Sequence, residues 1–350
     1  MGPPHPRVLE GSVTPDRWSY TVGWICALST EMVAAQAFLD QEHQKFTENS
    51  QNDHNSYTLG RIGAHNVVLA PLPEGVYGTT AAATVARDML SSFPNVRVGL
   101  MVGIGGGAPG LRNDIRLGDV VVSCRRGGTP GVLPYDHGKA IQNQSFLQTG
   151  ILNEPPQLLS IAVASLKARY EKKGHQLNSA VETALQTIKR KKNYRRPCAT
   201  TDRLYESSVV HPKDQSAACS EVCGDQDLVS RPERDEDDDN PAIHYGLIAS
   251  ANTLMKDARA RDTLAKDRGV LCFETEAAGL MNHFPCLVIR GICDYSDTHK
   301  NDEWQGFAAM MAAAYAKDLL DEISPGTVKS AKRMGEVLGS GQFCNSLIYI

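Results

Sequence analysis

The chain has 350 residues, of which 41% are hydrophobic and 22% charged, a composition typical of a globular protein, and we find no apolar segment of the length needed to span a membrane. Its formal net charge of −4 provides no general attraction to nucleic acid or to an anionic membrane, so we expect neither as a partner. The nine cysteines are odd in number and several lie inside apolar runs, which favours reduced thiols and hence the cytoplasm, or in second place the nucleus.

The N-terminal half of the chain predicts strands and helices in alternation. Residues 1–19 are polar and include four prolines, so we expect a disordered N-terminal tail there. Strands that alternate with helices favour a mainly parallel or mixed sheet with both faces covered. Hydrophobic periodicity predicts, in chain order, a strand over Thr21–Leu28, a helix over Glu31–Leu39, strands over Ser56–Ile62 and Asn66–Leu72, a helix over Thr79–Ser92, and strands over Val96–Gly103 and Asp119–Ser123.

A cluster of glycines follows the strand predicted to end near Gly103. Gly103, Ile104, Gly105, Gly106 and Gly107 precede no obvious helix, and their spacing does not match the GxGxxG dinucleotide pattern. Glycines at this point would let backbone amides approach a sugar or an anion closely. A tight turn without a binding role is the alternative interpretation.

The middle of the chain changes in character after a predicted helix over Gln157–Lys173. Residues 189–196 form a basic run and residues 235–239 an acidic run. Blocks of like charge are usually solvated, so we predict that residues 193–240 are a charged surface insertion. The basic run also resembles a nuclear address or an RNA contact, but a solvated helix end is the simpler interpretation.

Two cysteines within this insertion, Cys219 and Cys223, are spaced like the beginning of a zinc site. No second pair of cysteines follows at ligand spacing, so the sequence argues against a metal ion there. We therefore expect neither a metal nor an organic cofactor.

Near the C-terminal end, two short apolar runs both lead into acidic residues. Gly269–Phe273 is followed by Glu274 and Glu276, and Leu287–Ile289 is followed by Asp294. Ligands of open α/β sheets bind beyond the carboxyl ends of the strands, so these side chains outline an active site. Carboxylates there can act as a general acid and as acceptors for hydroxyl groups, the two roles needed to break a bond to a sugar.

The last predicted element is an Ala-rich helix over Gly306–Ile323. With it, a single domain spans residues 20–324, interrupted by the insertion. Residues 325–350 are predicted to be a loosely attached C-terminal tail.

Six segments occur in the order seen in the nucleoside phosphorylase and nucleosidase superfamily. The chain is most similar to fungal purine nucleoside phosphorylase-like proteins, with methylthioadenosine nucleosidase as the better-understood relative. The resemblance covers about residues 20–320 apart from the insertion, and implies a three-layer α/β domain whose central mixed sheet closes into a distorted barrel flanked by helices, in a homo-oligomer. The segments are Ala27–Glu31, Val102–Gly107, Leu117–Ser123, Gly246–Ser250, Phe273–Ala278 and Arg290–Asp294.

The resemblance also implies catalytic roles for the acidic residues. It makes Asp294 the general acid that protonates N7 of a purine leaving group, which lowers the barrier to breaking the glycosidic bond. Glu276 corresponds to the glutamate that accepts hydrogen bonds from the ribose hydroxyls, whereas Glu274 fits better as an acid in the first turn of a helix. Thr275 departs from the methionine common at its position.

The residue at position 31 distinguishes between two reactions. In the bacterial phosphorylases of this superfamily, the loop that contains position 31 supplies an arginine to phosphate, and a second arginine falls about where Met101 stands. In the nucleosidases, the same loop supplies a glutamate that activates water. Glu31 would repel phosphate but serve as a general base, so the sequence favours hydrolysis. The alternative is that Glu31 only opens the helix that follows it.

Further residues are assigned to the substrate by the same resemblance. The Gly103, Ile104 and Gly105 backbone would form the sugar side of the pocket. Leu254, Met255, Phe273 and Thr275 would contact the nucleoside, although Leu254 and Met255 are equally consistent with a core position. Clustered cations after the strand Asp119–Ser123 would suit a phosphorylated substrate, and the candidate phosphate-binding residues are Arg125, Arg126 and Lys139. A solvated loop without a binding role is the simpler interpretation.

These observations predict a hydrolase that cleaves a purine nucleoside to free base and ribose. The alternatives are a phosphate-dependent purine nucleoside phosphorylase and a nucleosidase that acts on AMP or ATP. A non-catalytic nucleotide-sensing module is disfavoured, because such a module would have no need to keep Glu31, Glu276 and Asp294. Nucleic-acid binding is the weakest option, because its only support is the basic run.

Overall fold

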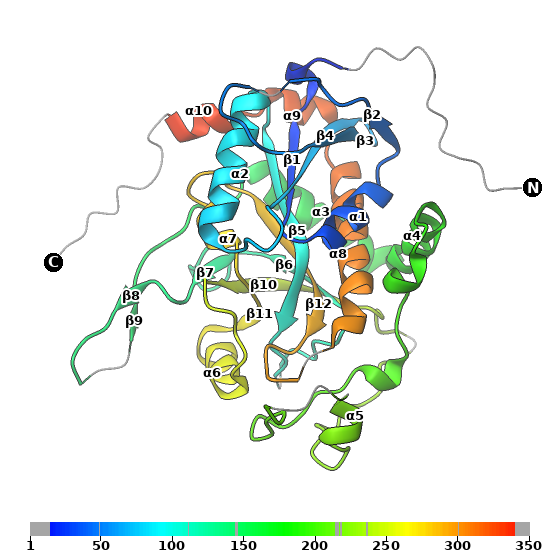
Figure 1. The fold of residues 1–350 in the computed structure, drawn as a ribbon, viewed down its shortest axis with the longest axis vertical. Helices are drawn as coiled ribbons and strands as arrows, with labels where there is room; N and C mark the ends of the chain where they lie inside the picture. The colour runs from blue at the N-terminus through cyan, green and yellow to red at the C-terminus, as the bar shows by residue number, and fades with distance from the viewer. Residues whose placement is uncertain are drawn as a thin grey trace, which may run out of the picture.

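The computed structural model describes residues 15–339 except positions 49, 111, 144, 145, 214–216, 218, 236 and 300. The predicted N-terminal tail lies outside the described residues except for residues 15–19, where Arg17–Ser19 form a short 3-10 helix. Figure 1 shows the course of the described chain, with its helices and strands labelled.

The central layer is a sheet of ten strands that closes on itself in part. Neighbouring strands follow the order β11, β10, β6, β12, β5, β1, β4, β3, β2, with β7 beside β10 and a further pairing between β11 and β5. That pairing closes β11, β10, β6, β12 and β5 into a barrel. The strands are β1 (Val22–Cys26), β2 (Gln41–His43), β3 (Thr58–Ile62), β4 (His65–Pro71), β5 (Val98–Gly107), β6 (Val120–Ser123), β7 (Val132–Pro134), β10 (Ile243–Ser250), β11 (Val270–Glu274) and β12 (Leu287–Asp294).

The barrel is mixed, because β5 runs antiparallel to β11 and β12 runs antiparallel to β6, whereas its other neighbouring strands are parallel. The four strands β1, β4, β3 and β2 extend from β5 as an open sheet. The predicted fold class, a mixed sheet that closes into a distorted barrel between helices, is therefore confirmed.

The glycine cluster lies inside strand β5 and not in a turn after it. Gly106 and Gly107 pair with Phe273 and Cys272 of β11, so they form the closure of the barrel. A Cβ on Gly105 would come within 2.6 Å of the Cys272 sulfur and 2.9 Å of the Phe273 carbonyl oxygen, so a larger residue would hold the two strands apart. The expectation that the strand ends near Gly103 was wrong because strand pairing, and not local turn chemistry, decides the conformation here.

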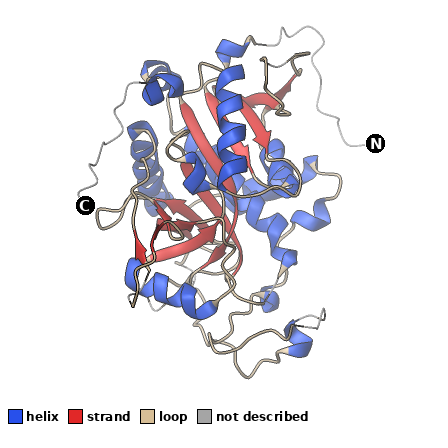
Figure 2. Ribbon diagram, turned by 60° about the vertical axis from the view of Figure 1, so that its left-hand side comes forward, coloured by secondary structure: helices blue, strands red, loops and turns tan. Residues whose placement is uncertain are grey.

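Helices cover both faces of the sheet, as Figure 2 shows. Helix α8 packs on β12, β5 and α1, and α2 packs on α7 and on β1. Among the described residues, no helix is long and apolar enough to cross a membrane. The helices of this body are α1 (Ser29–Ala37), α2 (Thr79–Ser92), α3 (Gln157–Lys173), α4 (Leu177–Ala184), α6 (Ala258–Arg268), α7 (Ala277–Leu280) and α8 (Gln305–Asp321).

Two short helices, α9 (Pro325–Ser330) and α10 (Met334–Gly339), follow α8. Val328 and Met334 are buried, and the Met334 amide donates to the Val96 carbonyl oxygen at 2.8 Å. The prediction of a loosely attached tail therefore does not hold for residues 325–339, because two widely spaced apolar side chains dock them to the domain. Residues 340–350 lie outside the described part of the chain.

The described part of the insertion lies at one end of the barrel and contains the short helix α5 (Cys219–Val222), seen at the bottom of Figure 1. Arg234 anchors it, because its guanidinium contacts Asp119 Oδ1 at 2.7 Å and Oδ2 at 2.5 Å. Asp119 precedes β6 and is fully buried, and it also accepts from His244 Nε2 at 2.9 Å. The charged segment is thus attached to the barrel by a buried ion pair.

Candidate active site

The carboxyl ends of β11 and β12 open into one cavity of about 290 Å³. The barrel closure brings these ends next to the beginning of α1 and to the glycine half of β5. The predicted site residues that line the cavity are Glu31, Ile104, Gly105, Leu254, Met255, Phe273, Thr275, Glu276 and Asp294. Gly103 is not in the lining and lies behind Glu31, where an added Cβ would meet the Glu31 carboxylate.

Asp294 is the last residue of β12. The chain turns sharply after it, since Ser296 has a φ of 53°, and the Ser296 amide donates back to Asp294 Oδ1 at 2.8 Å. Burial raises the pKa of the Asp294 carboxyl against the opposing effect of this hydrogen bond, which favours the protonated form that a general acid needs. On the neighbouring strand, a Cβ at Gly106 would lie 2.5 Å from Oδ1, so only glycine leaves room for the carboxyl group.

Glu31 lies in the first turn of α1 and is buried. Its Oε2 accepts from the amides of Ala27 at 2.6 Å and Leu28 at 3.0 Å, and its Oε1 accepts from the Ile104 amide at 2.8 Å. The same carboxylate therefore opens the helix and lines the cavity. Burial raises its pKa, although Arg290 and the backbone donors act in the opposite direction.

Glu276 and Glu274 take different positions at the beginning of α7. Glu274 is the last residue of β11 and so precedes the first turn in which the sequence placed it, but it accepts from the amides of Glu276 at 3.1 Å and Ala277 at 3.0 Å at the beginning of α7. Glu276 accepts from the Thr275 hydroxyl and, at 3.4 Å, from the Gly78 amide.

Arg290 is a central residue of the site that the sequence analysis did not single out. It is fully buried in the middle of β12 and contacts Glu274, as well as Glu276 Oε2 at 3.2 Å and Glu31 Oε1 at 3.8 Å. Burial alone would lower its pKa, but the three carboxylates outweigh this and keep the guanidinium charged. The available signal was a charged side chain within an otherwise apolar strand, which requires a buried partner.

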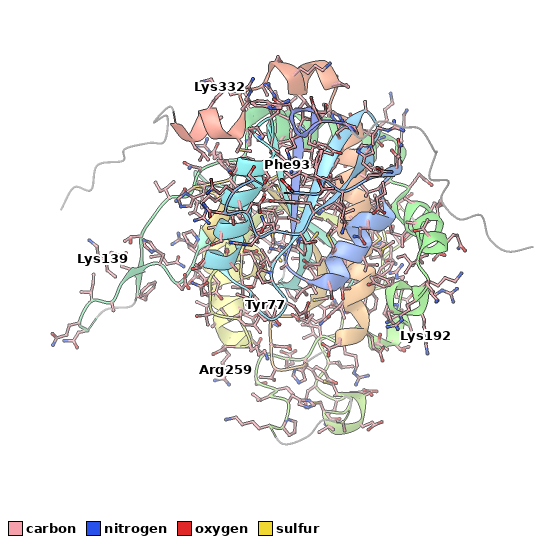
Figure 3. The ribbon with its side chains drawn as sticks, turned by 45° about the horizontal axis from the view of Figure 1, so that its top comes forward. Tyr77, Phe93, Lys139, Lys192, Arg259 and Lys332 are labelled. Carbon is pink, nitrogen blue, oxygen red and sulfur yellow. The ribbon has the colours of Figure 1, made fainter. Side chains whose placement is uncertain are left out.

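The three candidate phosphate-binding residues are not in the cavity lining. Arg125 is exposed and pairs with Glu154 at 3.3 Å, and Arg126 begins a short turn with Thr129. Lys139 lies on the exposed hairpin of β8 (Gly138–Lys139) and β9 (Leu147–Gln148), which projects from the body of the molecule (Figure 3). The chain after β6 leaves the barrel, so closeness to β6 in sequence did not bring these cations to the cavity.

The apolar side of the cavity differs from the predicted one in detail. Leu254 is 63% exposed and so is not a core residue, whereas Met255 packs against the cluster that contains Phe273. The Tyr135 ring meets the Phe273 ring edge-on, with centroids 5.6 Å apart. Tyr77, labelled in Figure 3, adds an aromatic side chain to the lining that the sequence analysis missed.

Comparisons with known proteins agree with this architecture. A nucleotide-binding leucine-rich repeat (NLR)-like protein of Hyaloscypha variabilis is 46% identical over 322 residues, which are 92% of this chain but only 31% of that protein. Among solved structures, the 5'-methylthioadenosine/S-adenosylhomocysteine nucleosidases of Helicobacter pylori and Neisseria meningitidis superpose with TM-scores of 0.51 and 0.53. Each is 15% identical, and the match covers 87% of this chain and 99% of theirs.

Futalosine hydrolase of Helicobacter pylori superposes with a TM-score of 0.50 at 15% identity and the same coverage, 87% of this chain and 99% of that one. At such identities the likeness to solved structures shows the shared fold alone. A family model covers most of the chain: the model of the phosphorylase superfamily matches residues 21–324, and the chain belongs to that superfamily.

Proposed function

We propose that the protein hydrolyses the N-glycosidic bond of a purine nucleoside. The observation that supports this most strongly is that Glu31, Glu276 and Asp294 line one cavity, in which Lys256 and Arg290 are the only lysine and arginine among the described lining residues. The nucleosidases with the same fold support the reaction class. The hydrolysis of other N-ribosyl compounds belongs to the same reaction class.

The charge of the cavity favours water over phosphate as the nucleophile. Arg290 is already surrounded by Glu31, Glu274 and Glu276, so it has little charge to offer a phosphate ion. A phosphate next to these carboxylates would be repelled, while a cationic, oxocarbenium-like ribose would be stabilised.

In the proposed reaction, Asp294 gives its proton to N7 of the purine as the bond between C1′ and N9 breaks and its electron pair moves to the base. Glu276 accepts hydrogen bonds from the ribose hydroxyls. Glu31 takes a proton from a water molecule, whose oxygen forms the new bond to C1′. The products are the free base and ribose, and proton exchange with solvent returns Asp294 to its protonated form and Glu31 to its ionised form.

The experiment incubates the purified protein with adenosine, inosine, guanosine, uridine and 5'-methylthioadenosine, with and without inorganic phosphate, and identifies both products. We expect free purine and free sugar without phosphate. Asp294→Asn and Glu31→Gln should each lower the rate by about 10²- to 10⁴-fold, because each removes one proton-transfer group. Strict dependence on phosphate, with a sugar 1-phosphate as product, would contradict hydrolysis.

Asp257→Asn is the matched control. Asp257 caps α6 by accepting from the amides of Arg259 at 2.9 Å and Ala260 at 3.1 Å, and it does not line the cavity. Asparagine caps a helix as well as aspartate does, so this variant should keep the wild-type rate.

A nucleotide is the second candidate substrate, favoured by one observation: the exposed Lys256 lines the same cavity. An ammonium group there would pair with a 5′-phosphate. If AMP is the substrate, Lys256→Met should raise its KM and leave the KM for adenosine unchanged. Cleavage of adenosine alone would reject the nucleotide.

A further inference from the structure

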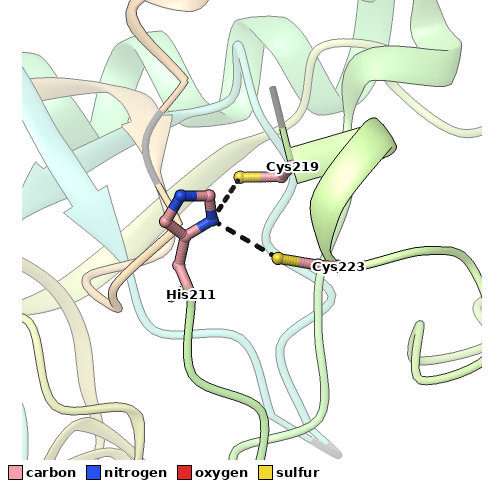
Figure 4. Close-up of side chains that lie close together, drawn as sticks. All are labelled: His211, Cys219 and Cys223. Atoms are coloured by element: carbon pink, nitrogen blue, oxygen red, sulfur yellow. Dashed lines mark hydrogen bonds between the residues drawn. The ribbon is translucent and has the colours of Figure 1, made fainter. Parts of the chain in front are cut away.

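The insertion contains three side chains of metal-binding type that the fold brings together. His211 Nδ1 lies 3.5 Å from Cys219 Sγ and 3.3 Å from Cys223 Sγ (Figure 4). All three ligand atoms lie within 4.8 Å of one another. We propose that His211, Cys219 and Cys223 bind a zinc ion.

The spacing of these atoms fits the size of a tetrahedral zinc site. With zinc about 2.3 Å from sulfur and about 2.0 Å from nitrogen, a sulfur and a nitrogen on the same ion are about 3.5 Å apart. Both measured distances agree with that edge of the tetrahedron. The cluster therefore needs only a small adjustment to accept the ion.

The ligand types favour zinc over magnesium and calcium. Two thiolates and an imidazole form a soft to borderline set, whereas magnesium and calcium require oxygen ligands. Cys219 begins α5 and Cys223 directly follows its last residue, and the Cys223 amide donates to the Cys219 carbonyl oxygen at 2.8 Å, so both side chains lie on the same side of this helical turn. Zinc would displace the thiol protons to solvent, and the fourth position would be open to water or another ligand.

The sequence does not show the second cysteine pair of a common zinc motif at this site, because the third ligand is a histidine. His211 precedes Cys219 by eight residues and itself lies outside the helices and strands of the described residues. Nothing in the local pattern distinguishes it from other surface histidines, so only the fold of the insertion identifies it.

The cluster is joined to the loop that follows Asp294. The His211 amide donates to Thr298 Oγ1 at 2.8 Å, and the Tyr205 ring stacks on the His299 ring with centroids 4.1 Å apart. Arg231 donates to the Tyr295 hydroxyl at 2.9 Å. A zinc ion would thus fasten the insertion against the loop that positions the Asp294 carboxyl, while the metal site itself does not depend on the proposed hydrolysis.

The test measures metal content in the full chain, purified without a metal-affinity tag. Elemental analysis should find about one zinc ion per chain, as expected of a single structural site. After removal of zinc with a chelator, titration with Co²⁺ should produce a thiolate-to-cobalt charge-transfer band and the visible bands of tetrahedral cobalt. Cys219→Ser and Cys223→Ser should lose both signals.

Two variants make the result specific. Cys198→Ser removes an exposed thiol outside the cluster and should bind zinc like the wild type. Cys223→His retains a ligand at that position and should restore a zinc ion that Cys223→Ser has lost. If the serine variants do not fold, stripping the wild type and adding zinc back supplies the same test.

Three results would overturn the proposal. One is a wild type that contains no zinc and gives no charge-transfer band with cobalt. The three side chains would then be joined only by hydrogen bonds between thiol and imidazole groups. Another is a disulfide between Cys219 and Cys223 in reducing buffer, detected by mass spectrometry. The third is zinc bound equally by the wild type and the serine variants, which would place the ion elsewhere.

Discussion

Arg290 brings a single positive charge among the carboxylates of Glu31, Glu274 and Glu276. One buried cation does not compensate three ionised acids, and burial raises the pKa of both Glu31 and Glu274. Asp294 has a raised pKa without a direct arginine partner. The site therefore separates Asp294, whose pKa burial raises without an arginine at hand, from glutamates held beside a guanidinium that opposes the same effect.

The first prediction concerns the pH dependence of the proposed reaction. Above the raised pKa of Asp294 the acid loses its proton, so kcat/KM should fall as the pH rises. Below the pKa of Glu31 the base becomes protonated, so kcat/KM should fall as the pH drops. The pH profiles of the wild type and of Glu31→Gln measure this, and the variant should lose the acidic limb and retain the alkaline one. An acidic limb that persists in Glu31→Gln would exclude Glu31 as the base.

At the scale of elements, the attachment of the insertion depends on the buried Asp119. Burial alone would raise its pKa, but the hydrogen bonds from Arg234 and His244 outweigh burial and hold the pKa below its usual value. Asp119 also accepts from the Ala242 and Arg116 amides, each at 2.8 Å, so one carboxylate connects β6, β10 and the insertion.

The second prediction is that Asp119→Asn lowers the free energy of unfolding by about 3 to 5 kcal/mol at neutral pH, because it leaves the Arg234 charge without its buried partner. Since the folded-state pKa is lowered, the stabilisation is present above about pH 4 and is lost as the pH falls through the folded-state pKa. Urea unfolding at neutral and acidic pH would measure both effects.

Asp225→Asn is the comparison for this prediction, because Asp225 pairs with Arg203 at the surface and is 75% exposed. Its loss should change the free energy of unfolding by only about 0 to 1 kcal/mol. Equal losses in the two variants would show that Asp119 does not anchor the insertion.

At the scale of the whole molecule, helix α8 packs directly on the barrel. Most of its residues are buried and many are alanine, so the helix axis can approach the sheet closely. The approach is tight at Gly291 of β12, where an added Cβ would lie 1.9 Å from the Ala308 carbonyl oxygen. Because Gly291 lies between Arg290 and Asp294, this contact links the packing of α8 to the strand that carries the site.

The third prediction is that Gly291→Ala destabilises the protein. We expect its free energy of unfolding to fall by about 1 to 3 kcal/mol or more, the usual cost of overpacking, because the neighbour is backbone and cannot rotate away. Thermal unfolding would measure this. Gly335→Ala in α10 is the control, because a Cβ there meets nothing within 4 Å and alanine favours a helix. A Gly291→Ala protein as stable as the wild type would mean that α8 is less closely packed.

Features encoded by near neighbours in the chain were predicted well. The helices over Thr79–Ser92 and Gln157–Lys173 have the bounds that the sequence predicted. The acidic ends of β11 and β12 do line one cavity, although the two strands run in opposite directions, because both pair with β5 and Phe273 and Asp294 meet the same residue there, Gly106. Their catalytic roles stay predictions until the reaction is measured.

Sequence alone thus determined the alternation of strands and helices, the family resemblance and the carboxylates of the cavity, since periodicity and motif order depend on residues close together in the chain. Only the tertiary structure decided that the glycine cluster closes a barrel, that Arg290 joins three glutamates, that Arg125, Arg126 and Lys139 lie away from the cavity, and that His211 meets Cys219 and Cys223. Each of these depends on the pairing of distant segments, which burial and strand register select and which no local pattern records.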